Sequence, residues 1–528
     1  MIRAFASQTA QQLRLRENQV FFALTVVIGV LAGLSAVLFS LGIDATTRGL
    51  FGLSPSWTRL LLVPPIVSLI TGILLARYFP GVRGSGVPQT EAAFHLDGGR
   101  IPLSVPLGKF LTGVLCIGSG HSMGREGPSV QIGAGLASVI GRWLRLSPER
   151  VKELVPVGAA AALSAAFNTP VAAVVFALEE IIGDMNATLL GSTVVASVAS
   201  VMVERSILGN EPLFHVPTYR LAHPAELIAY AILGIVGGLV SLVFCKSLLA
   251  LRAAFRRLPP WTKMLQPAIG GVAIGLLLLY APQVRGVGYE YVDQALNGGL
   301  LFKTLIVLCA MKLAATVISY SSGNAGGIFA PSLFLGAMVG GIVGTIVHRY
   351  ATFPTGAPGA YALVGMGALF AGIIRAPMTS VFMIFEITQD YQILVPLMVA
   401  NLLSFAISKR YQSAPVYHAL LQQDGVHLPS PATQDIGPVQ TARHMMIPDV
   451  SFIPPDASIE QAWQMTSEQR AQGYLVGTRD RLVGSLSHQQ LDASRRAGHG
   501  SEPVASIVDT AFVHAHADHP IDVVLQRF

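Results

Sequence analysis

Long apolar runs separated by short polar segments make up most of the chain. Four of them cover Phe21 to Leu41, Leu60 to Tyr78, Leu227 to Leu249 and Gly326 to Val347. Each is close to the roughly 20 residues that a helix needs to cross a bilayer. Other apolar runs are short and are broken by Gly or Pro. Because non-helical backbone at membrane depth is tolerated only where it is buried or lines a cavity, the pattern predicts a bundle of whole and broken transmembrane helices.

Composition supports a polytopic membrane protein. Of the 528 residues, 52% are hydrophobic and 12% are charged, whereas a soluble domain usually carries about 25% charged residues. The net charge is +6, and the basic residues are scattered over segment ends without interleaved aromatic residues. This distribution indicates membrane topology and argues against a nucleic-acid partner. The three cysteines, Cys116, Cys245 and Cys309, lie far apart in apolar segments and are expected to be packing residues.

The apolar part of the chain repeats itself. Five positions recur 203 residues later, namely Lys109 as Lys312, Gly120 as Gly323, Gly124 as Gly327, Pro128 as Pro331 and Gly133 as Gly336. A block upstream recurs at an offset of 202, and a block downstream, which pairs Glu179 with Glu386, recurs at 207. The pattern predicts an internal duplication of the transporter type, with repeats at about 19–206 and 224–410. We infer that the repeats are inverted, because inversion lets their helix N-termini converge near the midplane.

One carboxylate stands out in the first repeat. From Leu107 to Ile140 the only charged residues are Lys109, Arg125 and Glu126, and a carboxylate at membrane depth is costly enough to indicate a functional site. A helix is expected to restart at Pro128, so the free N–H groups of the preceding glycine-rich turn can hold an anion. The alternative, a carboxylate that only stabilises a helix end, is worth about 0.3–1 kcal/mol. Arg125 either neutralises a helix end or faces an aqueous vestibule.

Three motifs resemble the signature of the CLC family of chloride channels and chloride/proton antiporters. They are Gly84-Ser85-Gly86-Val87-Pro88, Gly124-Arg125-Glu126-Gly127-Pro128 and Gly327-Ile328-Phe329-Ala330-Pro331. The resemblance extends over about Gln19 to Leu421 and includes Pro415-Val416-Tyr417. It implies an all-α polytopic membrane protein, a CLC-type inverted repeat of broken helices that forms a homodimer with one anion pathway per subunit. No enzyme is implied, and neither an HExxH motif nor a GxSxG motif with triad partners is found.

The resemblance also assigns an anion site. Ser85 and Tyr417 would donate hydroxyls to a dehydrated chloride, and the backbone N–H groups of Ile328 and Phe329 would close the other side. Such donors replace the hydration shell with partial charges, whereas a full positive charge would trap the ion. On the sequence alone, Ser85 is also explained as a helix cap and Tyr417 as an interfacial aromatic residue. Serine at this position favours chloride, and a polyatomic anion such as nitrate stays open.

Two glutamates match the family's coupling residues. Glu126 matches the gating glutamate, which occupies an anion site when ionised and swings out when protonated. Glu180 matches the intracellular glutamate of the antiporters and is the candidate for proton transfer, the alternative being a solvated helix end. Its neighbour Glu179 is expected to be structural, because it has a repeat partner in Glu386. The predicted function is therefore exchange of chloride for protons across the cell (inner) membrane, and a passive gated anion channel of the same fold is the alternative.

The C-terminal part has a different composition. Residues 424–440 are polar and proline-bearing, as in a linker. Residues 441–507 resemble a CBS domain, a small α/β unit, with strands expected at Val450–Ile453, Gly473–Gly477 and Leu482–Ser485 and a helix after Asp456. A second copy would begin near Phe512 and stay incomplete within 508–528, which favours a chain that is a fragment of a longer protein. In this copy, Asp518 and Ile521 repeat Asp456 and Ile459.

The resemblance to CBS domains also predicts a ligand for the C-terminal part and the side of the membrane on which the two termini lie. Complete CBS pairs bind adenine nucleotides, so a nucleotide is the one small molecule suggested there, and no resident cofactor is expected. His514, His516 and His519 have no cysteine or acidic set to complete a metal site. Residues 1–18 carry arginines without a signal-peptide pattern and are expected to form a cytoplasmic segment. A soluble C-terminal domain then places both termini in the cytoplasm.

Overall fold

The computed structural model describes residues 2–52, 54–184, 189–210, 213, 214, 216, 221–428, 441–446, 452–466, 473–478, 481–510, 514–519, 521 and 524, with side chains from residue 21 onward except at position 444. The chain divides into two compact units, Met1–His427 and Leu428–Phe528. Each unit has a hydrophobic core of its own. The first unit corresponds to the apolar part of the sequence, and the second to the polar part.

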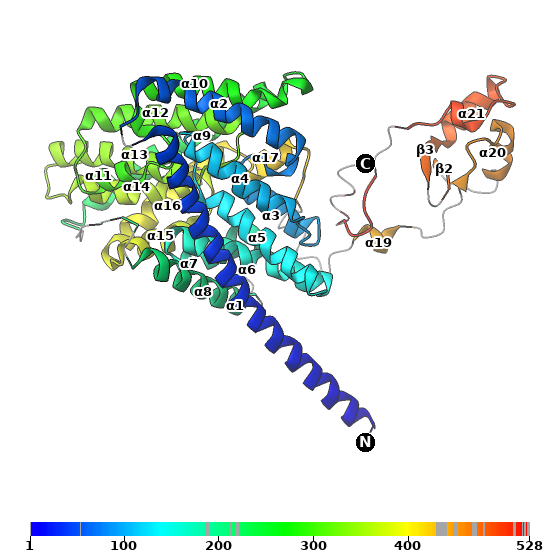
Figure 1. Cartoon of the computed structure of the whole chain (residues 1–528), viewed down its shortest axis with the longest axis horizontal. Coiled ribbons are helices and arrows are strands. Elements are labelled where there is room, and N and C mark those ends of the chain that lie inside the picture. The colour runs from blue at the N-terminus through cyan, green and yellow to red at the C-terminus, as the bar shows by residue number, and fades with distance from the viewer. Residues whose placement is uncertain are drawn as a thin grey trace. The chain divides into compact units, whose positions relative to one another are not determined.

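Helices form the first unit (Figure 1). They are α1 (Ile2–Phe51), α2 (Trp57–Arg77), α3 (Val87–His95), α4 (Ser104–Gly118), α5 (Glu126–Trp143), α6 (Pro148–Phe167), α7 (Pro170–Phe176), α8 (Leu190–Leu208), α9 (Glu226–Arg256), α10 (Gln266–Tyr280), α11 (Tyr289–Leu296), α12 (Phe302–Ser321), α13 (Phe329–Tyr350), α14 (Pro358–Ile373), α15 (Pro377–Thr388), α16 (Leu394–Tyr411) and α17 (Val416–Gln423). Short helical turns join them: η1 (Pro80–Val82), η2 (Ala177–Ile182), η3 (Pro260–Met264), η4 (Pro282–Val284) and η5 (Tyr391–Ile393).

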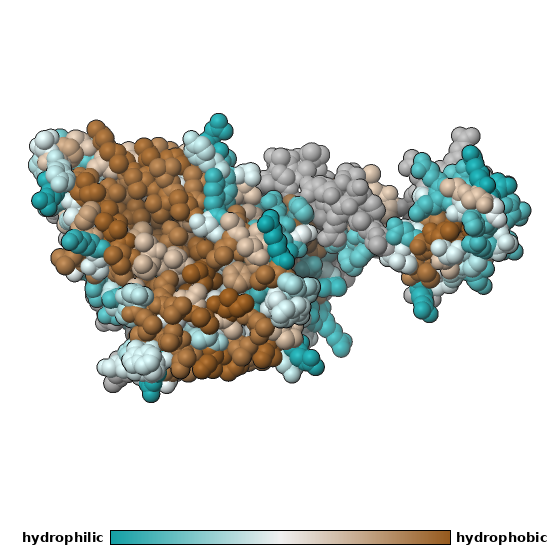
Figure 2. All heavy atoms as spheres, turned by 90° about the horizontal axis from the view of Figure 1, so that it is seen from above, coloured by the Kyte–Doolittle hydropathy of each residue, from teal (hydrophilic) through white to brown (hydrophobic). Residues whose placement is uncertain are grey.

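Seven helical segments of the described residues are long and apolar enough to cross a membrane. They include α1, α2, α9 and α13, which confirms the four long spans predicted from the sequence. Helices α4, α10, α14 and α15 are apolar but only 10–17 residues long, as expected for broken spans. The first unit carries broad apolar surface in the view of Figure 2, and exposed residues such as Ile66, Ile228 and Leu276 are suited to contact with lipid.

The two repeats are tied together by a reciprocal pair of carboxylates. Glu179, just after α7, accepts a hydrogen bond from the backbone N–H of Thr379 in the first turn of α15 at 2.8 Å. Glu386, near the end of α15, accepts one from the N–H of Ala172 in the first turn of α7 at 2.7 Å. Each helix therefore begins where the other ends, so the repeat-related helices α7 and α15 run antiparallel. This geometry is that of an inverted repeat, and it makes Glu179 a structural cap.

Matching glycines let the helices of each repeat pack closely. Gly133 of α5 faces Gly158 of α6, and the repeat-related Gly336 of α13 faces Gly365 of α14. A Cβ atom at any of these positions would collide with the backbone of the facing helix. The close crossings are of the small-residue kind that is common between membrane helices. They hold the first turns of α5 and α13 in fixed positions.

The second unit is a small α/β unit. Its sheet has the order β1-β2-β3, with β1 (Phe452–Ile453) parallel to β2 (Gly473–Gly477) and β2 antiparallel to β3 (Leu482–Ser487). The other elements are α19 (Ala442–Met445), α20 (Ile459–Thr466), α21 (His488–Arg496) and η6 (Val504–Ser506). The strands β2 and β3 and the helix α20 lie where the sequence predicts them. Residues 429–440, 447–451 and 511–513 are outside the described part, and with them most of the expected linker, the start of the first strand and Phe512.

Candidate functional site

The three glycine motifs meet at one place, as predicted. The Gly124 N–H donates to the Gly327 carbonyl at 2.7 Å, and the Gly327 N–H donates back to the Gly124 carbonyl at 2.8 Å. The Gly84 carbonyl accepts from the Gly326 N–H at 3.0 Å. These bonds join the loops that precede α3, α5 and α13. The first turns of the three helices, which carry N–H groups without partners inside the helix, are thereby brought together.

Glycine is needed at this junction because the backbones nearly touch. A Cβ atom at Gly327 would lie 3.2 Å from both the Gly124 carbonyl oxygen and the Gly127 nitrogen. A Cβ atom at Gly127 would lie 2.9 Å from the Ser85 carbonyl oxygen and still closer to the Ser85 hydroxyl. Gly86, which precedes α3, has φ of +101°, a left-handed conformation that L residues rarely adopt.

Two buried lysines hold the loops of the site. The ammonium of Lys109 donates to the carbonyls of Val82 (2.8 Å) and Gly84 (2.7 Å). The repeat-related Lys312 donates to the carbonyl of Gly286 at 2.7 Å, in the turn before α11. Both ammonium groups bind backbone carbonyl oxygens, so equivalent hydrogen bonds hold the turn before Ser85 and the turn before Tyr289.

The gating candidate Glu126 lies in the first turn of α5. This helix begins at Glu126 and not at Pro128 as predicted, because the Ser129 N–H already closes a helical turn on the Arg125 carbonyl at 3.0 Å. The Glu126 side chain is fully buried, and its Oε1 accepts a hydrogen bond from the hydroxyl of Tyr289. The carboxylate lies beside the backbone N–H groups of Glu126 itself and Ala330, although Oε2 makes no hydrogen bond of good geometry to a described residue. The carboxylate thus occupies a position between the first turns of α5 and α13.

Arg125, which the sequence left unassigned, packs on the same tyrosine. Its guanidinium carbon lies 5.6 Å from the centre of the Tyr289 ring, a cation–π distance. The guanidinium also donates to the Ser40 hydroxyl and, at 3.4 Å, to the Ala166 carbonyl. Arg125 therefore supports the ring that in turn binds Glu126, and it leaves the carboxylate free of a direct ion pair among the described residues.

Sequence reasoning missed Tyr289. The residue opens α11, directly after the turn Val284-Arg285-Gly286-Val287-Gly288 that repeats the turn around Ser85. A tyrosine in an apolar region is not anomalous in the way that a carboxylate is, so its own sequence drew no attention. The signal that could have found Tyr289 is its position. The turns around Ser85, Glu126 and Phe329 form the site, and the turn at residues 284–288, which repeats the first of them, directly precedes Tyr289.

Ser85 and Tyr417 present unpartnered hydroxyls to the site. Both side chains are fully buried, and neither hydroxyl has a hydrogen-bond partner of good geometry within the described residues. Tyr417 is near Ser85 and within electrostatic range of both Glu126 and Glu180. Ser85 caps no helix, since Gly86 is the residue that precedes α3 and Gln89 binds its N–H. The cap and interfacial alternatives for these two residues therefore do not hold.

Ile328 and Phe329 form the start of α13. Ile328 directly precedes the helix, Phe329 is its first residue, and both are buried. The Phe329 ring packs against Phe370 at a centroid distance of 4.4 Å and against Phe167 at 5.0 Å. These contacts fix the helix end, so its first N–H groups point in a constant direction. An N-terminus of this kind attracts anions.

Glu180 lies in a π-helical turn, a form that is rare and frequent at functional sites. The residue is 8% exposed, and its Oε1 is buried without a hydrogen-bond partner among the described residues. It is therefore not a solvated helix end. Glu91, Glu179 and Tyr417 lie within electrostatic range of its carboxylate. The adjacent Glu179 points elsewhere, toward the first turn of α15.

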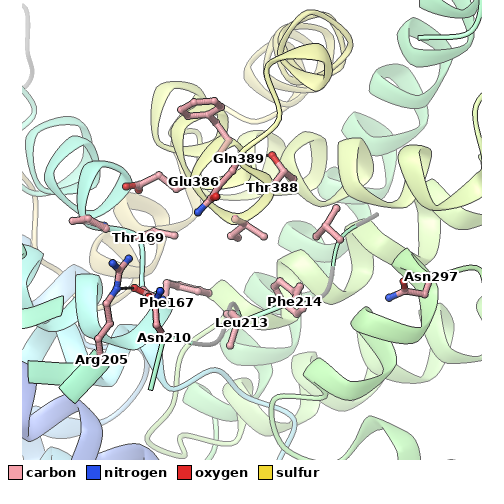
Figure 3. Close-up of a pocket in the computed structure, with 15 residues that line it drawn as sticks. Phe167, Thr169, Arg205, Asn210, Leu213, Phe214, Asn297, Glu386, Thr388 and Gln389 are labelled. Carbon is pink, nitrogen blue, oxygen red and sulfur yellow. Dashed lines mark hydrogen bonds between the residues drawn. The ribbon is translucent and has the colours of Figure 1, made fainter. Parts of the chain in front are cut away.

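A cavity of about 760 Å³ lies beside aromatic residues that pack on Tyr289, and its lining residues are drawn in Figure 3. Its lining includes Phe167 and Phe214, whose rings contact Tyr289 at centroid distances of 6.4 and 5.2 Å. Arg205 also lines it and donates from Nε to the Asn168 amide oxygen at 2.9 Å. The carboxylate of Glu386 lines the cavity as well, so the cavity is polar and carries one charge of each sign where it borders the aromatic residues around Glu126.

Among the described residues no group of three or more His, Cys, Asp or Glu side chains is arranged to hold a metal ion. In the second unit the rings of His514 and His516 lie 6.0 Å apart and those of His516 and His519 lie 5.1 Å apart. The chemistry that the first unit offers is therefore that of buried hydroxyls, helix N-termini and two carboxylates.

Comparison with known proteins agrees with this chemistry. Residues 67–409 match the protein family described as "Voltage gated chloride channel". A relative from Ralstonia nicotianae, described as a putative chloride channel protein ClcB-like, is 33% identical over 74% of this chain and 91% of its own length. A relative from Vibrio cholerae, described as the H(+)/Cl(-) exchange transporter ClcA, is 31% identical over 76% of this chain and 88% of its own length.

Solved structures show the same fold. A slow cyanobacterial Cl-/H+ antiporter aligns with a TM-score of 0.70 and 28% identity over 76% of this chain and 97% of its own chain. A eukaryotic CLC transporter aligns with a TM-score of 0.66 and 20% identity over 93% of both chains. The second alignment is longer than the first unit alone, so it reaches into the C-terminal unit.

Proposed function

The chain belongs to the voltage-gated chloride channel (CLC) family of membrane transport proteins, which are not enzymes, and we propose that it is a secondary active transporter that exchanges chloride for protons. Similar proteins from Vibrio cholerae and from a cyanobacterium are described as exchangers of these two ions. One observation carries the proposal for this chain. The buried carboxylate of Glu126 lies between the first turns of α5 and α13, at a place that suits an anion.

The chloride ion would bind between four donors. Ser85 and Tyr417 offer buried hydroxyls that have no partner of good geometry among the described residues, and a buried unpartnered donor is costly unless a ligand binds it. Ile328 and Phe329 offer backbone N–H groups at the start of α13. None of these donors is a full charge, so the site binds an anion and still releases it. Chloride is the substrate here, and it would compete with the Glu126 carboxylate for the neighbouring helix ends.

Glu126 would couple the two ions. In its ionised form the carboxylate stays near the helix ends and excludes chloride, as in the described conformation. Protonation removes its charge, so the side chain leaves the helix ends and chloride enters. The proton must then travel to or from the other side of the membrane. Glu180 is proposed to carry it, because its buried oxygen Oε1 has no hydrogen-bond partner in the described part of the chain and Tyr417 lies within electrostatic range of both glutamates.

Ion fluxes across reconstituted vesicles test this function. Liposomes that hold the full chain are given a chloride gradient, and chloride and proton movements are recorded in parallel. Proton uptake against its own gradient supports exchange. Chloride flux without proton movement would instead support the second candidate, a passive gated channel, which the description of the Ralstonia relative favours.

Two substitutions assign the roles of the glutamates. Glu126→Gln imitates the protonated gate, so we expect chloride flux to continue and coupled proton movement to stop. Glu180→Gln is expected to stop proton movement while Glu179→Gln, a change at the adjacent cap, leaves coupling in place. If Glu126→Gln still moved protons against their gradient, the gate would have to be another residue.

The assembly and setting follow from the family. We propose a homodimer in the cell (inner) membrane, surrounded by lipid, with both termini in the cytoplasm and no nucleic-acid partner. Single-cysteine labelling at both ends of the chain in intact cells tests the orientation. Mass measurement of the protein in detergent tests the dimer.

The C-terminal unit is proposed to be a CBS domain over 441–507, followed by the start of a second copy. A strand order of β1-β2-β3 with α20 between β1 and β2 supports this assignment. In the same unit the Arg443 N–H donates to the Ala517 carbonyl at 2.7 Å, so residues from the start of the domain pair with residues of the second copy. Calorimetric titration of the full chain with ATP, ADP and AMP tests nucleotide binding there, and no heat with any of the three would exclude it.

A further inference from the structure

A histidine and a glutamate form a close pair beside the proton site. Nε2 of His418 lies 2.6 Å from Oε1 of Glu91. The Glu91 side chain is 4% exposed, whereas that of His418 is 34% exposed. The pair therefore joins a buried carboxylate to a ring that solvent reaches. Neither residue has a role in the exchange described above.

Glu91 lies next to Glu180. Glu91 is on α3, and one turn later on the same face His95 contacts the carbonyl of Ile181 at 3.0 Å, the residue after Glu180. The carboxylates of Glu91 and Glu180 are within electrostatic range of each other. Glu91 Oε2 and Glu180 Oε1 are both buried without a hydrogen-bond partner in the part of the chain that the structure describes. Two such oxygens in one place indicate a polar gap that a proton or a transient water can bridge.

The other end of the pair faces an aqueous edge of the first unit. His418 is on α17, which ends at Gln423 and is followed by Asp424. Asp424 pairs with Arg252 at 2.8 Å and also with Arg256. A cluster of charges like this one belongs at the membrane–water boundary and not in lipid. The side of the membrane on which α17 ends is also the side from which the chain continues into the C-terminal unit.

We propose that His418 and Glu91 load protons onto Glu180 from the aqueous side reached by α17. The proposal rests on the proposed chloride/proton exchange and names the route by which its protons arrive. Water gives a proton to Nδ1 of His418, and the imidazolium releases its Nε2 proton to Glu91. The protonated Glu91 carboxyl group then rotates so that this proton faces Glu180, passes it on and becomes a carboxylate again. The ring is left with a proton on Nδ1 and returns to its first tautomer by exchange with water, so no charge accumulates.

Several charged or titratable groups surround the pair. Arg375 and His95 lie within electrostatic range of His418, and Lys152 lies within range of His95. The Arg375 guanidinium opposes a positive charge on the His418 ring, whereas the Glu91 carboxylate favours it. Near Glu180, Glu179 is the other carboxylate in range, and its oxygens are held by α15. Proton supply through the pair should therefore depend on whether the His418 ring is protonated.

Coupled proton uptake by His418→Gln and Glu91→Gln vesicles tests the route. Glutamine at 418 keeps an N–H near the position of Nε2 and cannot titrate, and glutamine at 91 keeps the shape and one acceptor. A positioned proton-transfer side chain contributes about 10²–10⁴-fold in rate, so we expect proton uptake to fall tenfold or more in each variant. Chloride flux in the same vesicles should persist, and the difference in proton uptake between the parent protein and the His418 variant should shrink from about pH 5 to about pH 8, as the histidine of the parent loses its proton. His95→Gln, which keeps a donor toward Ile181, is the matched control and should behave as the parent protein.

The outcomes separate this route from the exchange itself. If the parent protein moves no protons, the proposed exchange fails. If the parent protein exchanges ions and both glutamine variants keep its proton rate and pH profile, the route is wrong. The double variant should be no slower than either single variant, because the two residues act in series, and an additive loss would contradict the relay. If His418→Gln loses chloride flux as well, Glu91→Gln becomes the test: slow proton uptake with normal chloride flux supports the route, and proton uptake at the parent rate contradicts it.

Discussion

Two buried carboxylates in this protein have opposite surroundings. Glu126 has the Tyr289 hydroxyl and the N–H groups of two helix ends close to it, all of which favour its ionised form. Glu180 has an oxygen without a partner and two other carboxylates in range, which favour its neutral form. Both carboxylates are buried, and Glu126 differs from Glu180 in having hydrogen-bond donors beside it. The difference suits a gate that must return to its ionised form after each cycle.

The hydroxyl of Tyr289 is expected to set the pH at which the gate opens. Tyr289→Phe keeps the ring on which Arg125 packs and removes the hydrogen bond to Glu126. Hydrogen bonds to charged groups contribute about 1.5–3 kcal/mol, and about 1.4 kcal/mol corresponds to one pH unit. We expect the midpoint of the chloride flux against pH to move to higher pH by about one to two units. The flux is measured in vesicles over a pH series.

A neighbouring tyrosine provides the control for this change. Tyr291→Phe removes a hydroxyl from the same helix, α11, from a residue that is only partly buried. Its pH profile should match that of the parent protein. An unchanged midpoint in Tyr289→Phe would mean that the hydrogen bond does not contribute to gating.

The sequence alone identified those site residues whose side chains are unusual in a membrane-spanning segment. Glu126 was found because a carboxylate in an apolar run demands an explanation. Tyr289 and His418 were not found, since an aromatic or neutral histidine side chain is tolerated at the edge of a membrane bundle. Their significance comes from what they contact, and Glu91 contacts His418 from a position 327 residues away. Such a contact follows from the tertiary fold alone.

At the scale of elements, the starts of α3, α5 and α13 can meet only because glycine has no side chain. Gly127→Ala would place a methyl group against the Ser85 hydroxyl and 2.9 Å from its carbonyl. We expect chloride flux to fall strongly, because Ser85 is displaced or the chloride position is filled. Gly49→Ala, where a Cβ meets nothing within 4 Å, should transport normally. Chloride efflux together with gel filtration separates a blocked site from a misfolded protein, and normal flux in Gly127→Ala would contradict the proposed chloride position.

The reciprocal caps of α7 and α15 are expected to stabilise the fold equally. Removing a helix cap costs about 0.5–2 kcal/mol, so Glu179→Ala and Glu386→Ala should each lower the thermal unfolding midpoint in detergent. The two shifts should be similar, because the two carboxylates bind related amides across the inverted repeat. Glutamine at either position should recover part of the loss, since its amide oxygen still accepts one hydrogen bond. A large shift for one residue and none for the other would show that the two caps are not equivalent.

The sequence predicted elements better than their ends. Long apolar runs gave α1, α2, α9 and α13, because length and hydropathy alone determine a span. The start of α5 was placed at Pro128, since proline favours a first turn, but the helix begins at Glu126. The π-helical turn at Glu180 was predicted as ordinary helix. Both differences come from tertiary contacts that local preference does not contain.

At the scale of the whole molecule, the two units differ in what they share with relatives. The cyanobacterial antiporter aligns over 97% of its own chain with 76% of this one, so its length corresponds to the first unit. Every residue proposed to bind or carry an ion, from Ser85 to His418, lies within Met1–His427. The repeat in the sequence also ends there. We therefore propose that exchange is a property of the first unit.

A chain that stops after His427 should accordingly keep coupled exchange. The first unit has its own core, and its last helix, α17, is anchored within it by Arg252, which binds Asp424 at 2.8 Å and Gln423 at 2.9 Å. We expect the shortened chain to show the chloride flux and the chloride-to-proton ratio of the full chain in vesicles. The full chain, prepared in parallel, is the control. If the shortened chain is folded by gel filtration but moves protons slowly, the C-terminal unit acts on the α17 side of the proton route. A nucleotide that changes proton uptake in the full chain alone would then identify the C-terminal unit as a regulator of His418 and Glu91.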